Sequence, residues 1–363
     1  MKITDVKARV LLGRFIIVQV ETDAGLIGYG ECSPMNAPVT KALVESALKP
    51  LVMGASPFDT ERLWERMAVA TKKLGPMGVQ MNSIAGVDIA LWDLLGKALG
   101  QPIYNLLGGL YRERVPLYAS FGGGRRLSAQ EIGARAGRYA ELGFGAVKVR
   151  MDWQEDHTDP EPDHGLDAVR AMRAAVGEQV DIMFDPNNGY SPHRAIQIGR
   201  RLEEYRVFHF EEPVAAYDYA GLAAVADALD LPVAAGEQEY TRWQFRDLIL
   251  QGKVDIVQPD IIKAGGISEL RKIAAVAQTF NRPITMHQTQ PTIGTLAALH
   301  FALATPNCRY RQEFPAEDHP LKSAGLLREP LPFKDGYLYP PEGPGLGIAV
   351  DPAALDRLEA AGR

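Results

Sequence analysis

From about residue 115 onward, short apolar segments of strand length alternate with longer segments of helical periodicity. Eight strands of this kind are expected, beginning near residues 115, 145, 180, 207, 232, 254, 283 and 308. Such alternation is typical of parallel βα units, and eight units close into a barrel. After the eighth strand, residues 315–350 are rich in Pro and Gly and lack helical periodicity, so the barrel should end on a strand. The pattern predicts an α/β fold with a barrel over residues 115–320.

A separate α+β unit is predicted for residues 1–114. Alternating apolar residues over 2–31 predict antiparallel strands, and residues 38–72 are expected to be helical. Apolar residues at helical spacing between Ile84 and Ala98 predict a further helix, which Gly100 and Pro102 would end. Residues 321–363 are expected to return to this unit, with DPAALDRLEAA as a short terminal helix.

Three acidic residues, Asp185, Glu211 and Glu237, fall at equal spacing at the ends of three successive predicted strands. The C-terminal ends of barrel strands meet on one face, so these carboxylates should converge. Converging anions repel one another unless a cation neutralises them. A ligand set of oxygens without Cys or His favours Mg²⁺ over Zn²⁺. The sequence therefore predicts Mg²⁺ as the cofactor.

The second predicted barrel strand ends in AVKVRM, where Lys148 and Arg150 are two residues apart and point to the same face. A cation at a strand end is often a solvated or salt-bridged surface group, and this interpretation stays open. Opposite the acidic residues, however, Lys148 could neutralise a substrate carboxylate. Arg150 is protonated at any ordinary pH, which makes it a hydrogen-bond donor and a poor base.

Asp260 ends the sixth predicted strand and His287 ends the seventh, so the two should be neighbours. A carboxylate that is hydrogen-bonded to one imidazole nitrogen fixes the tautomer and makes the other nitrogen more basic. His287 is therefore the predicted general base, and a core histidine without a chemical role is the alternative. Glu313, which ends the eighth strand, could hydrogen-bond the substrate carboxylate as an acid or be a surface residue.

In this order, the motifs resemble those of the enolase superfamily, specifically the mandelate racemase subgroup that includes acid-sugar dehydratases. The match covers nearly the whole chain and consists of GVDIALWDLLGKALGQPIYNLLGG, KVR, DPNNGY, FEEP, GEQ, QPD followed by KAGG, MH and the final Glu. The resemblance implies a modified (β/α)7β TIM-like barrel with an N-terminal α+β capping domain that the C-terminal segment completes. It also implies roles for the residues already named: Asp185, Glu211 and Glu237 as metal ligands, Asp260 and His287 as a dyad, and Lys148, Arg150 and Glu313 around the substrate.

The chemistry that the resemblance implies is removal of the proton α to a carboxylate, with Mg²⁺ stabilising the resulting dianion. A racemase needs a base on each face of the α-carbon, and here Arg150 stands where a second base, Lys, is usual. One-base chemistry is therefore favoured, in which His287 removes the α-proton and delivers it to a departing β-hydroxyl. We expect a hydro-lyase that converts an aldonate or aldarate into a 2-keto-3-deoxy acid. The alternatives are a racemase or epimerase of a 2-hydroxy or amino acid, and a non-catalytic barrel scaffold.

Further substrate contacts are expected from Asn187 and from the capping domain. Asn187, two residues after the first metal ligand, could bind a substrate hydroxyl or simply cap a turn. Arg14 and Lys72 lie in stretches that, by the resemblance, fold over the active site, although surface charge is the alternative for both. The acidic segment 151–164 could form a lid, a second metal site or a solvated loop.

The composition argues against several classes of partner. The net charge is −6 and no dense run of Lys and Arg occurs, so neither nucleic acid nor an anionic membrane is expected to bind. The segment MKITDVKARV lacks the apolar stretch of a signal peptide, and no apolar run approaches membrane-spanning length. Cys32 and Cys308 have neither a metal nor a redox spacing, which fits a reducing cytoplasm. We expect a cytoplasmic enzyme with a small-molecule carboxylate substrate, and the resemblance implies a homo-oligomer.

Overall fold

The computed structural model, which describes residues 1–153 and 158–362, begins with an antiparallel sheet of β1 (Ile3–Leu11), β2 (Phe15–Thr22) and β3 (Ile27–Cys32). Leu11 pairs with Phe15 across a tight turn in which Gly13 has φ 69°, a conformation that favours glycine. The helices that follow are α1 (Ala37–Leu43), the π-helical η1 (Val44–Leu48), α2 (Lys49–Val52), α3 (Thr60–Thr71), the 3₁₀ turn η2 (Lys72–Leu74), α4 (Val79–Leu99) and α5 (Ile103–Leu106). Gly100 ends α4 in the left-handed conformation, as the sequence predicts.

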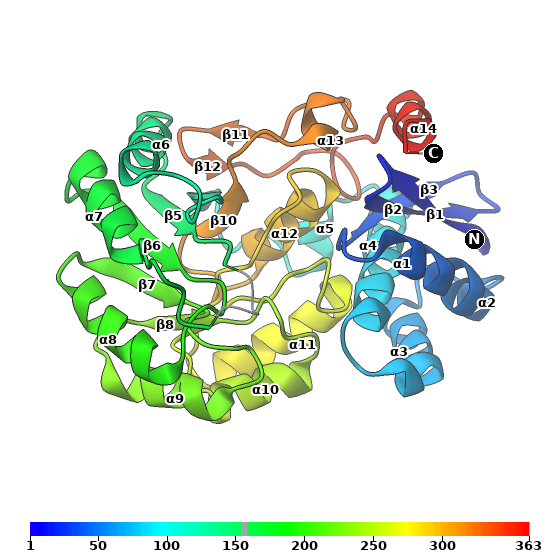
Figure 1. Ribbon diagram of the computed structural model, residues 1–363. Helices are drawn as coiled ribbons and strands as arrows, with labels where there is room; N and C mark the ends of the chain where they lie inside the picture. The colour runs from blue at the N-terminus through cyan, green and yellow to red at the C-terminus, as the bar shows by residue number, and fades with distance from the viewer. Residues whose placement is uncertain (154–157, 363) are drawn as a thin grey trace.

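Parallel strands form the barrel wall, each paired with the next: β4 (Val115–Phe121), β5 (Ala146–Arg150), β6 (Asp181–Asp185), β7 (Val207–Glu211), β8 (Val233–Ala235) and β9 (Ile256–Val257). Strand β10 (Gln312–Pro315) pairs in parallel with β4. The helices that surround the strands are α6 (Ala129–Glu141), α7 (Gly165–Val176), α8 (Pro192–Glu203), α9 (Tyr219–Ala228), α10 (Arg242–Leu250), α11 (Gly266–Thr279) and α12 (Ile293–Ala304) (Figure 1). This architecture confirms the expected α/β class, a modified TIM-like barrel with an N-terminal capping unit.

The barrel wall is irregular at the seventh predicted strand. The segment near residue 283 forms only an isolated bridge between Ile284 and Val257. Pro283 has no N–H to donate to a strand ladder. The side chain of Gln312 on β10 takes over part of the pairing, because its amide donates to the Ile284 carbonyl (3.0 Å) and accepts from the Met286 N–H (2.8 Å). A side chain thus joins the seventh segment to the eighth strand, which begins at Gln312, later than the sequence predicts.

The C-terminal segment contacts both parts of the molecule. It contains α13 (Pro320–Ser323), β11 (Phe333–Lys334), β12 (Tyr337–Leu338) and α14 (Pro352–Ala360). Strand β12 pairs with the start of β4 and so extends the barrel sheet. Helix α14 packs beside β1, where Leu12 N–H donates to the Leu358 carbonyl (3.0 Å) and Arg9 pairs with Asp356 (2.7 Å) and Glu359 (2.8 Å). Figure 1 shows α14 in red next to the blue sheet, so the capping unit is completed from the C-terminus.

Buried hydrogen bonds fix the capping unit against barrel helix α11. Trp64 of α3 donates its indole N–H to the carbonyl of Gly265 (2.7 Å). Trp92 of α4 donates to the Ser268 hydroxyl (2.9 Å). The buried Asp88 carboxylate accepts from both the backbone N–H (2.9 Å) and the hydroxyl (2.5 Å) of Ser268. Polar groups without access to water need such partners, so the relative position of the two units is tightly specified.

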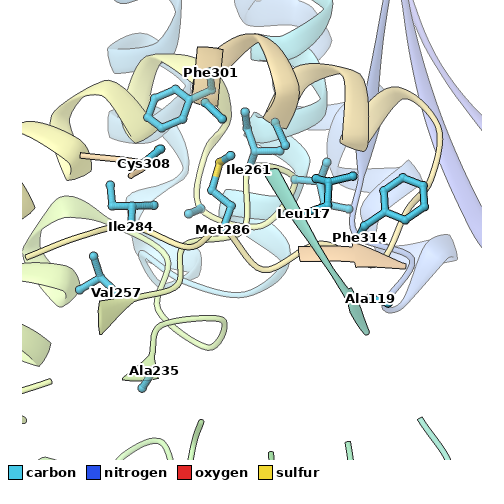
Figure 2. Packing of buried hydrophobic residues seen from close by; sticks show 14 of the residues in the cluster. Leu117, Ala119, Ala235, Val257, Ile261, Ile284, Met286, Phe301, Cys308 and Phe314 are labelled. Carbon is cyan, nitrogen blue, oxygen red and sulfur yellow. The ribbon is translucent and has the colours of Figure 1, made fainter. Parts of the chain in front are cut away.

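Apolar side chains of the barrel strands pack against those of the surrounding helices in one large core cluster. Figure 2 shows Leu117 of β4, Val257 of β9, Ile284 and Met286 of the seventh segment, and Phe301 of α12 in this cluster. These side chains are at most 2% exposed. Among the helices that the structure describes, none has the length and hydropathy needed to cross a membrane.

Strand β3 and helix α4 approach so closely that only glycine fits between them. A Cβ on Gly30 would lie 1.9 Å from the Gly86 carbonyl oxygen, and a Cβ on Gly28 would lie 2.2 Å from that of Ala90. We expect Gly30→Ala to lower the free energy of unfolding by about 1–3 kcal/mol, because the strand and helix must move apart. Denaturant titration measures the change.

A matched control is Gly137→Ala on α6, where a Cβ would meet no atom within 4 Å. This substitution should be neutral or stabilise by up to about 1 kcal/mol, since Ala favours helix more than Gly does. Equal effects of Gly30→Ala and Gly137→Ala would contradict the close packing.

The buried His300 makes the fold sensitive to acid. Its Nδ1 accepts a hydrogen bond from the Tyr104 N–H (3.2 Å), and burial lowers the pKa of His300 to about 4. An unfolded chain binds this proton near pH 6.5, so stability is present above pH 6.5 and is lost as the pH falls towards 4. His300→Asn should flatten the loss of stability over this interval by up to about 3 kcal/mol relative to wild type. Unfolding curves at pH 8, 6 and 4.5 test this, and parallel losses in the two proteins would contradict it.

Candidate active site

The three acidic residues of the predicted metal site lie at the same end of three neighbouring strands. Asp185 is the last residue of β6, Glu211 is the last residue of β7, and Glu237 follows β8 by two residues. Asp185 and Glu211 are 0% and 1% exposed, and the Glu237 side chain is 12% exposed. Between β8 and Glu237, Gly236 has φ 142°, and a Cβ there would lie 2.7 Å from the Gln258 nitrogen. The turn that presents Glu237 therefore requires glycine.

Lys148 of β5 supplies positive charge beside these carboxylates. Its Nζ lies 2.5 Å from Glu211 Oε1, 2.9 Å from Glu313 Oε1 and 4.0 Å from Asp185 Oδ2, and the side chain is fully buried. Although burial disfavours the charged amine, Glu211 and Glu313 hold the pKa of Lys148 well above its ordinary value. Lys148 is therefore protonated and is not a surface residue.

The negative charge of the carboxylates that Lys148 does not neutralise suits a divalent cation. Burial and the neighbouring Glu211 carboxylate raise the pKa of Asp185 well above its ordinary value. Over residues 1–153 and 158–362, no three His, Cys, Asp or Glu side chains are already arranged as metal ligands, because Glu211 binds Lys148 and Glu237 binds His287 instead. The donors are nevertheless all oxygens, buried and adjacent, and this set suits Mg²⁺.

His287 and Asp260 form a buried hydrogen-bonded pair. His287 Nδ1 lies 2.7 Å from Asp260 Oδ2, and Asp260 Oδ1 accepts from the Ile262 N–H (2.9 Å). An ionised carboxylate only accepts, so the proton of this bond belongs to Nδ1. The other ring nitrogen, Nε2, lies 2.9 Å from Glu237 Oε2. Although burial disfavours the charged ring, Glu237 and the hydrogen bond to Asp260 raise the pKa of His287 to about 10.

Many of these groups face a cavity of about 410 Å³, a volume suited to a small molecule. The capping unit contributes Arg14, Phe15, Ser33, Pro34 and Met35 to its lining. The barrel contributes Ser120, Arg150, Asn187, Glu237, Lys263, His287, Gln288, Thr289, Gln290, Glu313 and residues 315 and 317–320. The cavity therefore joins the capping unit to the barrel mouth.

Arg150 and Glu313 are both positioned at this cavity. Arg150 lies 3.9 Å from Asp152 and 3.7 Å from Glu317, contacts too long for close ion pairs. Burial opposes its charge, but Asp152 and Glu313 raise the pKa of Arg150, so it stays protonated. Glu313 is 4% exposed, and its Oε2 accepts from the Gln288 N–H (2.9 Å). Glu313 is therefore a buried residue, not the surface residue of the alternative interpretation.

Both the nitrogen and the oxygen of the Asn187 side-chain amide form hydrogen bonds within the protein. Its Nδ2 donates to Asp185 Oδ2 (3.0 Å), and its Oδ1 accepts from the Asp152 N–H (2.8 Å). The residue has φ 49°, in the left-handed region that Asn tolerates in turns. These contacts favour the interpretation that Asn187 caps a turn and orients Asp185.

Neither Lys72 nor the described residues of segment 151–164 line the cavity. Lys72 lies in η2 after α3 and is exposed, and it is not among the lining residues, unlike Arg14. The reason is that η2 continues α3, which packs against α4 and α11. Within the acidic segment 151–164, residues 154–157 lie outside the described residues. Asp163 binds the Tyr190 hydroxyl (3.1 Å) and Arg194 (3.0 Å), which is a structural role, and the lid and second metal site stay untested.

Sequence reasoning missed several polar residues at the cavity: Ser120, Gln288, Gln290, Glu317, Asp318 and His319. In the sequence, only their position at or directly after the ends of predicted strands indicated that they could line the cavity. That signal is weak, because polar residues at strand ends are common in loops of any barrel.

Comparisons with known proteins agree with this architecture. Residues 6–108 match the mandelate racemase and muconate lactonizing enzyme N-terminal domain, and residues 131–354 match the enolase C-terminal domain-like family. An arabinonate dehydratase of Saccharolobus solfataricus is 33% identical over 92% of this chain and 88% of its own length. A D-xylonate dehydratase of Haloferax volcanii is 32% identical (99% and 88%), and a D-galactarolactone cycloisomerase of Agrobacterium fabrum is 34% identical (94% and 90%).

A solved structure is similar over almost the whole chain. It is a mandelate racemase/muconate lactonizing protein from Paracoccus denitrificans PD1222 complexed with magnesium, with a TM-score of 0.93 and 37% identity. The alignment covers 98% of this chain and 96% of that one. Because the matches span both structural units, the chain belongs to the enolase superfamily, in its mandelate racemase and muconate lactonizing enzyme subgroup.

Proposed function

We propose that this protein is a Mg²⁺-dependent hydro-lyase that removes water from a sugar acid and yields a 2-keto-3-deoxy acid. The observation that carries the proposal is the His287–Asp260 pair, 2.7 Å apart, beside Glu237 at the cavity. An imidazole that a carboxylate orients is suited to act as a general base. The arabinonate and D-xylonate dehydratases among the relatives support the same reaction.

The carboxylate of the substrate would bind near the positive groups at the barrel mouth. Mg²⁺ held by Asp185, Glu211 and Glu237 would supply the positive charge that stabilises the substrate's carboxylate oxygens when the α-proton leaves. Lys148 and Arg150 add fixed positive charge there, and fixed charge needs no reorganisation during the reaction.

His287 would carry the proton. Glu237 raises the pKa of His287, so once this carboxylate no longer faces the ring, Nε2 can lose its proton to water. The free Nε2 then removes the proton from the α-carbon, while Asp260 keeps Nδ1 protonated and the ring in place. The electron pair of the broken C–H bond forms a C=C bond as the bond from the β-carbon to its hydroxyl oxygen breaks. The proton on Nε2 passes to that oxygen, which leaves as water. The enol that remains tautomerises to the 2-keto acid.

Isomerisation is a second candidate, which the D-galactarolactone cycloisomerase relative favours. Dehydration gives a product lighter by one water, whereas isomerisation leaves the mass unchanged. Racemisation is less favoured, because Arg150 stays protonated and cannot serve as the second base. A homo-oligomer and a cytoplasmic location stay predictions.

The activity can be measured directly. Purified protein with Mg²⁺ should convert at least one member of a panel of aldonates and aldarates into a 2-keto acid, detected by mass and by a carbonyl reagent. His287→Asn should lower kcat by about 10²- to 10⁴-fold, because the general base is lost. His193→Asn, at an exposed position on α8, is the control and should keep wild-type turnover. Full turnover by His287→Asn, or no keto acid from any member, would contradict the proposal.

Metal binding has a separate signature in stability. Mg²⁺ at about 100 times its Kd should stabilise the folded protein by about 2.7 kcal/mol, since the unfolded chain does not hold the ion. The Tm should therefore rise with added MgCl₂ and fall with chelator. Asp185→Asn should remove this response, whereas Asp167→Asn, at an exposed position on α7, should retain it. If neither Mg²⁺ nor chelator changes the wild-type Tm, the interpretation as a non-catalytic scaffold would be favoured.

A further inference from the structure

Two glutamines in the loop between the seventh barrel segment and α12 leave polar atoms unpaired at the cavity wall. Gln288 and Gln290 are 2% and 4% exposed, and both line the cavity. Within the part of the chain that the structure describes, Gln288 Nε2 and Gln290 Oε1 have no hydrogen-bond partner. Leaving a buried donor or acceptor unpaired is costly, so these atoms indicate a ligand with matching groups.

The backbone of this loop is held by several hydrogen bonds, one of which also fixes the side-chain amide of Gln288. Gln288 Oε1 accepts from the Gln290 N–H (2.9 Å), which fixes the amide orientation because an amide nitrogen cannot accept. The Gln288 N–H in turn donates to Glu313 (2.9 Å). The Gln290 carbonyl accepts from both the N–H (3.1 Å) and the hydroxyl (2.8 Å) of Thr295.

The capping unit anchors the same loop. Glu31 of β3 is 1% exposed, and its Oε2 accepts from the Gly294 N–H (2.7 Å) and the Thr292 hydroxyl (3.1 Å). These bonds connect the cap to the start of α12, directly after the two glutamines. The loop is therefore built to be rigid, as a specificity-determining wall requires.

Ser120, at the C-terminal half of β4, adds a third group. It is 5% exposed, lines the cavity, and its hydroxyl has no partner among the described residues. The amide donor of Gln288, the amide acceptor of Gln290 and this hydroxyl together match alcohol groups, each of which both donates and accepts.

The charged residues of the cavity lining do not favour a second carboxylate. Its Lys and Arg residues are Arg14, Arg150 and Lys263, and its carboxylates are Glu237, Glu313, Glu317 and Asp318. Glu317 is already engaged by the Gly122 N–H (3.1 Å). A dianionic substrate would need surplus positive charge there, whereas neutral hydroxyls do not.

The geometry points to a hydroxyl-binding subsite formed by Gln288, Gln290 and Ser120. This subsite binds the alcohol groups on the substrate carbons beyond the α- and β-carbons, at which the reaction occurs. The substrate class is then a polyhydroxylated monocarboxylate, an aldonate, in preference to an aldarate or a short hydroxy acid. This inference rests on the proposed function, since it assigns the substrate of the same cavity.

The test compares two kinds of substrate in one variant. Glycerate keeps the carboxylate, the α-hydrogen and the β-hydroxyl but has no further carbons, so it cannot reach the subsite. Gln290→Leu should lower kcat/KM for the best aldonate by about 10- to 100-fold, the effect of one unmet hydrogen bond. The same variant should change kcat/KM for glycerate by less than about 3-fold. Equal losses on both substrates would show a merely structural role and overturn the inference, as would no loss on the aldonate or a wild-type preference for the aldarate.

Two further variants guard against misfolding and unspecific effects. Ser120→Ala should show the same dependence on substrate and leaves the loop intact. Gln278→Leu, at an exposed position on α11, should behave as wild type on both substrates.

Binding separates failure of the subsite from failure of the proposed function. If wild-type protein turns over neither glycerate nor any aldonate or aldarate, the proposed function is wrong. Calorimetric titration in the presence of MgCl₂ then tests the subsite. The subsite is supported if the Kd of the tightest-binding aldonate rises about 10-fold or more in Gln290→Leu. An unchanged Kd, or no binding of any aldonate to wild-type protein, overturns it.

Discussion

Repulsion between carboxylates at the barrel mouth is the constraint on which the rest of the site depends. The parallel strands bring Asp185 and Glu211 side by side in a buried setting, where like charges are costly. The buried amine of Lys148, 2.5 Å from Glu211 and 2.9 Å from Glu313, offsets part of that cost. Removing such an amine would leave buried anions unpaired, so Lys148 is as much a structural residue as a chemical one. The charge that Lys148 leaves unbalanced is what the proposed divalent cation would neutralise.

The capping unit acts on the chemistry through the loops that it holds. Trp64 and Asp88 fix the cap against α11, and Glu31 reaches across to the start of α12. The wall that carries Gln288 and Gln290 is therefore set by contacts between the two units and not by the barrel alone. In the proposed function, the residues at the strand ends would transfer the proton and hold the metal, and the cap with its anchored loop would select the substrate.

Much of the fold and the centre of the site could be predicted from the sequence, because strand ends in a parallel barrel must meet. That rule brings His287 to Asp260 without any knowledge of side-chain contacts. It could not predict that the seventh strand shrinks to a bridge at Ile284, where the side chain of Gln312 takes over part of the backbone pairing. Nor could it position Lys72, whose exposure depends on how α3 packs. Gln288 and Gln290 could not be predicted for a similar reason. Whether a side-chain amide lacks a hydrogen-bond partner depends on the positions of all its neighbours.

The central claim is that the three strand-end carboxylates hold a cation beside an imidazole that faces the α-carbon of a bound acid. A crystal structure of the His287→Asn protein with MgCl₂ and an aldonate tests it most directly. The account predicts one metal ion in contact with oxygens of Asp185, Glu211 and Glu237, and the substrate's α-carbon next to position 287. A metal bound elsewhere, or carboxylates that stay bonded to Lys148 while the acid lies outside the cavity, would contradict it.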